Sequence, residues 1–269
     1  MIGASRESLA TLVEQVDAAV GSSGFDAVAA DLLAVADLLE KQQTLRSALA
    51  DGGQSDQSRR DLAASLLQGK ISDTALGLVQ DAVITRWSAP HDLIDALELL
   101  AARAGFAAAD VQGSLDSVEE ELFRFSRAVA GSDSLQMTLT DPSIDATRKQ
   151  AVVTDLLAER ANPVTTLLAA HAVAHLRGRR ADAVLAELSA AAAERRDRVV
   201  AEVRVAAPLT QEQQERLAAS LSRLTSRSVR LNVAVDPAVL GGVHVRIGDE
   251  VIDGTVAARM EQARRALTS

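Results

Sequence analysis

The sequence predicts a mainly α protein, with two tandem helical bundles followed by a small α+β domain at the C-terminal end. Three observations favour this fold class: helical spacing of apolar residues over the first three quarters, a repeat of that pattern, and a change to period-two alternation afterwards. Hydrophobic residues make up 48% of the chain but aromatic residues only 2%, so aliphatic side chains must fill the cores. We expect domains at 1–108, 109–198 and 199–269.

The first bundle begins with an amphipathic helix predicted from Ser5 to Val20. Leu9, Leu12, Val13 and Val16 follow one another there at three- and four-residue steps. A longer helical pattern is interrupted at Gln42-Gln43-Thr44, and Gly52-Gly53-Gln54-Ser55 is typical of a loop. The helices expected after residue 20 cover 25–49 with that interruption, 59–67, 73–86 and 91–104.

The second bundle is predicted as a repeat of the first. LRSALAD, which starts at Leu45, returns as LQMTLTD starting at Leu135, an offset of 90 residues. The same offset holds without gaps and relates polar as well as apolar residues, which favours an internal repeat over coincidence in an Ala- and Leu-rich chain. Its helices are expected over 111–130, 145–160, 163–176 and 179–196, with a loop at Asp141-Pro142-Ser143. The paired positions are Leu32 and Leu122, Asp51 and Asp141, Leu66-Leu67 and Leu156-Leu157, Leu78 and Leu168, Ala82-Val83 and Ala172-Val173, and Asp92 and Asp182.

The third domain begins where the apolar period changes. Valines from Val199 to Val205 predict a strand, which Pro208 ends. Thr210 and Gln213 have the spacing of a capping box for a helix through Leu224, because each side chain can bond the other residue's backbone N–H.

Three further strands are predicted between residues 229 and 252. Val229 to Val235 and Val243 to Ile247 alternate apolar and polar residues, and Val251-Ile252 makes a short third strand. Asp236-Pro237, Gly241-Gly242 and Gly248-Asp249 are expected to make the turns, and Asp253 is expected to cap a final helix through Ala266. Three or four strands would form one sheet with helices against one face.

This last block resembles the signature of the delta subunit of F-type ATP synthases, the oligomycin-sensitivity-conferring protein family. Its aliphatic strand positions and the residues of the turns agree in register over many spaced positions, unlike a lone glycine motif. The expected structural signature is Asp236, Gly241, Gly242, Gly248, Asp253 and Gly254.

The resemblance implies a subunit without catalysis or cofactor that ties the catalytic head of the synthase to its peripheral stalk. The alpha subunits' N-terminal segments would bind a helical bundle, expected to contain the Ser5 to Val20 helix, and the b-type stalk subunit would bind Val199 to Ser269. The chain would lie at the cytoplasmic face of the cell membrane, associated with it only through the complex. An ordinary member has one bundle, so a long form with two leaves open which bundle binds alpha.

Composition excludes several other classes. The chain has no cysteine, so it has no disulfide scaffold, thiol nucleophile or cysteine zinc site. A formal net charge of −9 disfavours nucleic acid as a partner. No apolar run of 18 residues predicts a membrane span.

Few residues suggest chemistry of their own. His171 and His175 have the spacing of two zinc ligands on a helix, but Ala172 stands where a metalloprotease needs glutamate, so we expect no metal. Trp87 is more typical of a partly buried core residue than of a recognition anchor. The basic cluster Arg177 to Arg180 is typical of a solvated helix end, with an acidic partner as the alternative.

The rival functions are a free-standing helical adaptor or RNA-associated bundle, and, as the weakest, an enzyme.

Overall fold

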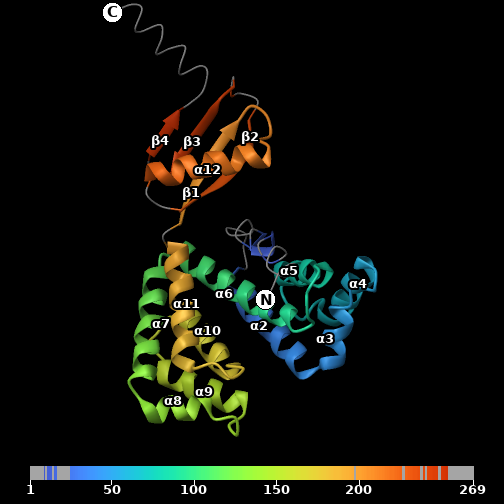
Figure 1. Cartoon of the computed structure of the whole chain (residues 1–269), viewed down its shortest axis with the longest axis vertical. Coiled ribbons are helices and arrows are strands. Elements are labelled where there is room, and N and C mark those ends of the chain that lie inside the picture. The colour runs from blue at the N-terminus through green and yellow to red at the C-terminus, as the bar shows by residue number, and fades with distance from the viewer. Residues whose placement is uncertain are drawn as a thin grey trace, which may run out of the picture. The chain divides into compact units, whose positions relative to one another are not determined.

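The fold is that of a computed structural model, which describes residues 25–196, 198–225, 228–236, 239, 241–247 and 250–253, together with residues 9, 11–13, 15 and 16. The chain divides into two compact units, Met1–Ala193 and Glu194–Ser269. The first is helical, and the second combines one described helix with a small sheet (Figure 1). The predicted fold class is therefore confirmed.

The first unit contains two series of helices related by the predicted offset. Helices α4 and α5 begin and end 90 residues before α9 and α10. The first series is α2 (Phe25–Lys41), α3 (Gln43–Leu49), α4 (Asp56–Leu67), α5 (Asp73–Ile84) and α6 (Asp92–Val111). The second is α7 (Leu115–Ala130), α8 (Asp133–Thr140), α9 (Ala146–Leu157), α10 (Pro163–Ala174) and α11 (Ala181–Arg196).

The repeat extends to individual hydrogen bonds. The backbone N–H of Ser72, before α5, donates to the carboxylate of Asp31 on α2 at 2.9 Å. Ninety residues later, the N–H of Asn162 donates to Glu121 on α7 at 2.8 Å. Each bond satisfies a backbone donor at a helix start with an acid from a distant helix of the same repeat.

The loops repeat as well. The carboxylate of Asp51 accepts from the N–H two residues on, and that of Asp141 does the same at the corresponding place. Gly69 and its counterpart Glu159 both have left-handed backbones, with φ of 74° and 55°. Glutamate rarely adopts this conformation. Its presence at the position that corresponds to Gly69 shows that the two repeats share the same turn geometry.

The junction between the repeats differs from the sequence prediction. Helix α6 continues to Val111, and α7 begins at Leu115 rather than at residue 111. The reversal lies at residues 112–114, where the N–H of Ser114 donates to the carbonyl of Ala109 at 2.8 Å and closes the end of α6. The boundary expected after residue 108 thus falls inside α6.

One hydrophobic core runs through both repeats. Leu32 and its counterpart Leu122 are both fully buried, as is Phe106 on α6. All three belong to the same cluster of buried side chains, which Leu12 and Val16 of the predicted first helix also join. Both repeats therefore lie in one compact unit. Their division into two separate bundles stays a prediction. The rest of the helix expected from Ser5 to Val20 lies largely outside the described residues.

The second unit is a four-stranded sheet with helix α12 (Gln211–Thr225) against one face (Figure 1). The strands are β1 (Arg198–Val205), β2 (Ser228–Val235), β3 (Val243–Ile247) and β4 (Glu250–Asp253), in the order β2-β1-β3-β4. Strand β1 runs parallel to β2, with Val203 opposite Val233, whereas β1–β3 and β3–β4 are antiparallel. The core joins Val203, Val245 and Leu221 of α12.

The predicted cap and glycine turn of this unit are present. The N–H of Thr210 donates to the side chain of Gln213 at 2.9 Å, and that of Gln213 donates to Thr210 Oγ1 at 3.3 Å, which confirms the capping box. Gly241 and Gly242 have φ of 81° and 82°, a conformation that glycine adopts without steric cost. Gly248, Asp249, Gly254 and the helix expected through Ala266 lie outside the described residues. Among the helices that are described, none combines the length and apolarity needed to cross a membrane.

Candidate functional site

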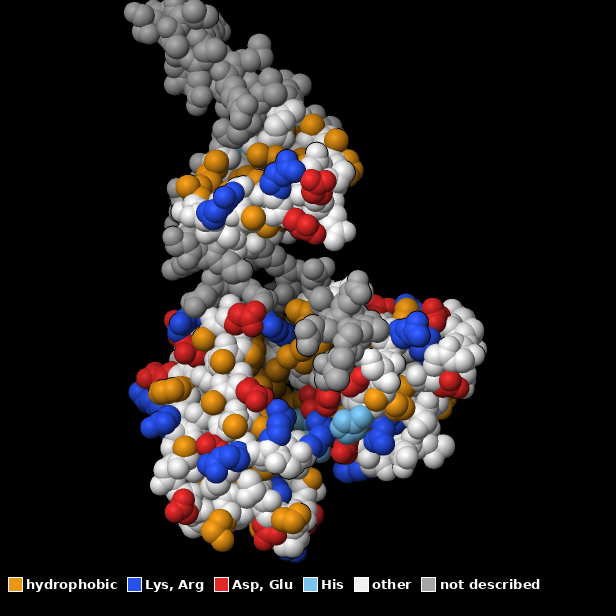
Figure 2. All heavy atoms as spheres, in the orientation of Figure 1, with side chains coloured by type: hydrophobic (Ala, Val, Ile, Leu, Met, Phe, Trp, Pro, Cys, Tyr) orange, Lys and Arg blue, Asp and Glu red, His pale blue; other side chains and the backbone are white. Residues whose placement is uncertain are grey.

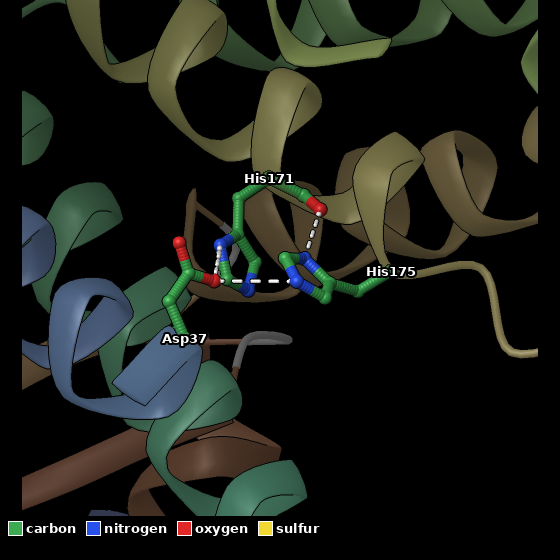
Figure 3. A group of neighbouring side chains, drawn as sticks. All are labelled: Asp37, His171 and His175. Atoms are coloured by element: carbon green, nitrogen blue, oxygen red, sulfur yellow. Dashed lines mark hydrogen bonds and ion pairs between the residues drawn. The ribbon is translucent and has the colours of Figure 1, made fainter. Parts of the chain in front are cut away.

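A charged cluster lies where helices of the two repeats meet. Asn162 accepts a hydrogen bond from the N–H of Val164, and Pro163 follows as the first residue of α10, so this helix has a strong start. His171 and His175, four residues apart, share one face near its end. That face is turned toward α2, from which Asp37 projects (Figure 3).

The three side chains converge on one oxygen atom. Oδ1 of Asp37 lies 3.4 Å from Nδ1 of His171 and 3.3 Å from Nε2 of His175 (Figure 3). The imidazole rings stack with their centroids 4.3 Å apart, and their side chains are 8% and 10% exposed. Among the described residues, this oxygen has no hydrogen-bond partner although it is buried.

Glu98, on α6, extends the cluster on the other side of His171. Its Oε1 lies 3.1 Å from Nε2 of His171 and accepts a 2.7 Å hydrogen bond from the guanidinium of Arg177. Burial alone would raise the pKa of Glu98, but the hydrogen bonds from His171 and Arg177 and the charge of Arg177 outweigh it. The pKa of this carboxyl is consequently lowered to about 2.

Arg177 ties the loop after α10 to the first repeat. Its guanidinium pairs with Glu98, with Asp95 at 3.2 Å and with Glu40 at 3.8 Å. Burial lowers the pKa of Arg177, but these carboxylates more than offset that effect and raise it. Its backbone φ of 48° is uncommon for a residue with a side chain.

We expect the substitution Glu98→Gln to destabilise the protein by roughly 2–3 kcal/mol at neutral pH, because the pKa of the Glu98 carboxyl lies far below the ordinary value. The folded pKa is the lower one, so the contribution is complete above pH 4.5 and is lost as the pH falls towards 2. Urea unfolding at several pH values should show the gap between wild type and variant closing on acidification. Glu187→Gln is the matched control, because the Glu187 side chain is 64% exposed in its ion pair with Arg179. This substitution should change the free energy of unfolding by less than about 1 kcal/mol. A gap that stays constant with pH would contradict this prediction.

A cavity of about 530 Å³ opens beside the cluster. Charged and histidine side chains line one part of it, and aliphatic side chains such as Leu99 and Leu168 line the rest. On the face shown in Figure 2, histidine, acidic and basic side chains gather together over the first unit. The site thus offers nitrogen and oxygen ligands next to space for water.

The sequence predictions for individual residues have mixed outcomes. Trp87 is partly buried, packs against the core and donates from Nε1 to the carbonyl of Ala82 at 2.8 Å, which favours the core interpretation. The alternative interpretation of Arg177 to Arg180 was a basic cluster that binds an acidic partner. In the structure, acidic side chains of the same chain pair with its three arginines. Arg177 pairs as described above, Arg179 pairs with Glu187, and Arg180 pairs with Asp182.

The structure brings together residues that sequence reasoning kept apart. The sequence predicts no metal role for the histidine pair, and Asp37 lies 134 residues before His171, with no motif to connect them. The predicted signature is a separate feature of the second unit, where Asp236 follows β2, Gly241 and Gly242 precede β3, and Asp253 ends β4. Ninety residues away in the other repeat, Asp81 and Thr85 stand in place of the histidines, so the cluster is not part of the repeated pattern.

Comparison with known proteins identifies the family. Residues 102–267 match the sequence model of the ATP synthase delta (OSCP) subunit. Proteins named ATP synthase subunit delta are similar along the whole chain. The one from Streptomyces griseus is 45% identical with 99% of each chain covered, and the one from Parafrankia is 48% identical with 100% of each covered.

The chain belongs to the ATP synthase delta (OSCP) subunit family. The resemblance found in the sequence is confirmed, including the long form, because the delta subunits of similar length also align over the first repeat. The family match itself begins within α6 and covers the second repeat and the α+β unit of this chain.

A solved assembly contains a chain with a weaker likeness to this one. A chain in the cryo-EM structure of the Toxoplasma gondii mitochondrial ATP synthase hexamer is 19% identical, with 62% of this chain and 95% of that chain covered. The TM-score is 0.29, too low for the likeness to carry any argument.

Proposed function

We propose that this delta-family chain is a non-catalytic stator subunit that links the catalytic head of an F-type ATP synthase to its peripheral stalk. In this role it binds the N-terminal segments of the alpha subunits and the b-type stalk subunit, at the cytoplasmic face of the membrane. The observation that carries the proposal is the full-length similarity to proteins named ATP synthase subunit delta.

The architecture supports such a role. A stator must transmit torque between two bodies, which requires well-packed elements and two separate places of attachment. The helical unit has a core continuous through both repeats, and the α+β unit has a core of its own. Two attachments on one chain also strengthen each other, because binding at one raises the effective concentration at the other.

We assign alpha binding to the helical unit and stalk binding to the α+β unit. Amphipathic helical segments dock into grooves between helices, a mode that a helical bundle offers to the alpha segments. The family match covers the second repeat, which supports this repeat as the ordinary bundle of the family and leaves the first as the additional copy.

A truncated chain tests this assignment. Helix α11 ends at Arg196 and β1 begins at Arg198, so a chain ending at Arg196 keeps the helical unit intact. We expect this truncated chain to retain the helical circular dichroism of its unit and to capture alpha subunits in a pull-down. Capture of the b-type subunit should be lost, and full-length chain in the same lysate is the control. A truncated chain that still captures b would defeat the proposal.

A further inference from the structure

We propose that Asp37, His171 and His175 form a structural binding site for a divalent transition-metal ion of the Zn²⁺ type, which clamps the two repeats together. This site goes beyond the stator function and does not depend on it. The three residues each offer one ligand atom, and these atoms all lie within 4.8 Å of one another. Two imidazoles and a carboxylate are a ligand set that suits zinc.

The hydrogen bonds outside the cluster orient both imidazoles for metal binding. Nδ1 of His175 lies 3.0 Å from the backbone carbonyl oxygen of His171, which can only accept, so this nitrogen donates and Nε2 is left with a free lone pair. Nε2 of His171 donates in the same way to Glu98, which leaves its Nδ1 lone pair free. Both free nitrogens face Oδ1 of Asp37 (Figure 3). Protein metal sites commonly hold their histidines by such outer hydrogen bonds.

A metal ion satisfies all three atoms at once, which protons do less well. With neutral imidazoles, three lone pairs point at one another and Asp37 Oδ1 accepts no hydrogen bond among the described residues. One proton shared between a histidine nitrogen and Oδ1 would leave the lone pair of the other nitrogen facing that oxygen. A cation between the three atoms is bound by all of them at once.

The distances also suit the ion. Zinc bonds nitrogen and oxygen at about 2.0–2.1 Å, and tetrahedral geometry then separates neighbouring ligand atoms by about 3.3–3.4 Å. The separations from Asp37 Oδ1 to the two histidine nitrogens are 3.3 Å and 3.4 Å. The adjoining cavity, which both histidines line, gives a water molecule access to the fourth position.

Charge in the surroundings favours a cation. Besides Asp37, the carboxyl groups of Glu40, Asp95 and Glu98 lie in this cluster. The guanidinium of Arg177 and the imidazole of His91 lie opposite them. A divalent ion would reduce the excess of negative charge and would join α2 of the first repeat to α10 of the second.

The test uses purified full-length chain, stripped with EDTA and titrated with ZnCl₂ by calorimetry and with CoCl₂ by visible spectroscopy. We expect one ion per chain, the intense d–d bands of tetrahedral Co²⁺, and a Tm raised by roughly 5–10 °C at zinc about 100-fold above Kd. The near-isosteric Asp37→Asn and the smaller His175→Ala should each weaken zinc binding by at least about tenfold.

Two controls separate a specific site from general histidine affinity. His91→Ala removes another histidine that lines the same cavity, and His244→Ala removes one in the second unit, so both should bind zinc as wild type does. Melting in EDTA shows whether each variant is folded, and Asp37→Asn carries the test if His175→Ala is not. The proposal is overturned if wild type binds no zinc, if Co²⁺ gives no tetrahedral spectrum, or if folded Asp37→Asn binds as tightly as wild type.

Discussion

Membrane vesicles whose synthase carries the chain ending at Arg196 are expected to lose proton-driven ATP synthesis by at least about tenfold. The reason is mechanical: if the α+β unit holds the stalk, its removal lets the head turn with the rotor, and rotation then performs no work on the catalytic sites. Heads that remain active should still hydrolyse ATP, because the proposed subunit contributes no catalytic group. Synthesis is measured after imposing a proton gradient, and hydrolysis is measured in the same vesicles.

The two rates together make this prediction specific. Equal loss of both would indicate damage to the catalytic head, and unchanged synthesis would contradict a linking role for residues 197–269. Full-length chain added back to vesicles depleted of this subunit is the control, and it should restore synthesis without changing the hydrolysis rate per head.

The second large effect is expected at Arg59, which is only 4% exposed. From α4 its guanidinium donates to the carbonyls of Val83 and Ile84 at the end of α5, at 2.6 Å and 3.2 Å, and to Asp56 at 2.6 Å. Arg59→Met keeps much of the side chain's length but leaves two helix-end carbonyls without this donor. We expect the free energy of unfolding to fall by roughly 2–4 kcal/mol.

The neighbouring arginine provides a matched control for that experiment. Arg60 pairs with Asp81 at 2.8 Å, but both side chains are about one third exposed. Arg60→Met should therefore cost less than about 1 kcal/mol. Urea unfolding followed by circular dichroism measures both variants. An equal loss of unfolding free energy in the two would contradict a special contribution from the burial of Arg59 and its bonds to the carbonyls.

Local signals explain why much of the fold could be predicted from the sequence. The interruption at Gln42 separates α2 from α3 as expected, since apolar spacing fails there. The Thr210 and Gln213 cap and the Gly241-Gly242 turn depend on residues a few positions apart, and both are present. The repeat was visible because buried leucines such as Leu32 and Leu122 preserve the core pattern.

Features that depend on distant contacts could not be predicted in the same way. The end of α6 at Val111 rather than near residue 104 is set by packing of its alanines in the shared core, which gives no stop signal in the sequence. The strand–helix–strand order favours a parallel pair of β1 and β2, but nothing local indicates that β3 lies on the other side of β1. The approach of Asp37 to His171 likewise depends on how α2 packs against α10, and only the structure reveals it.

Site-specific cross-linking in the assembled synthase tests directly which subunit each of the two units contacts. The chain has no cysteine, so single cysteines can carry a photoreactive cross-linker at exposed apolar positions without further substitutions. The positions are Val111, Phe123, Met137 and Leu156 in the helical unit, and Leu224 and Val235 in the α+β unit. Mass spectrometry should identify alpha subunits as the partner of the helical unit and the b-type subunit as that of the α+β unit. Capture of one and the same subunit from both units would contradict the account.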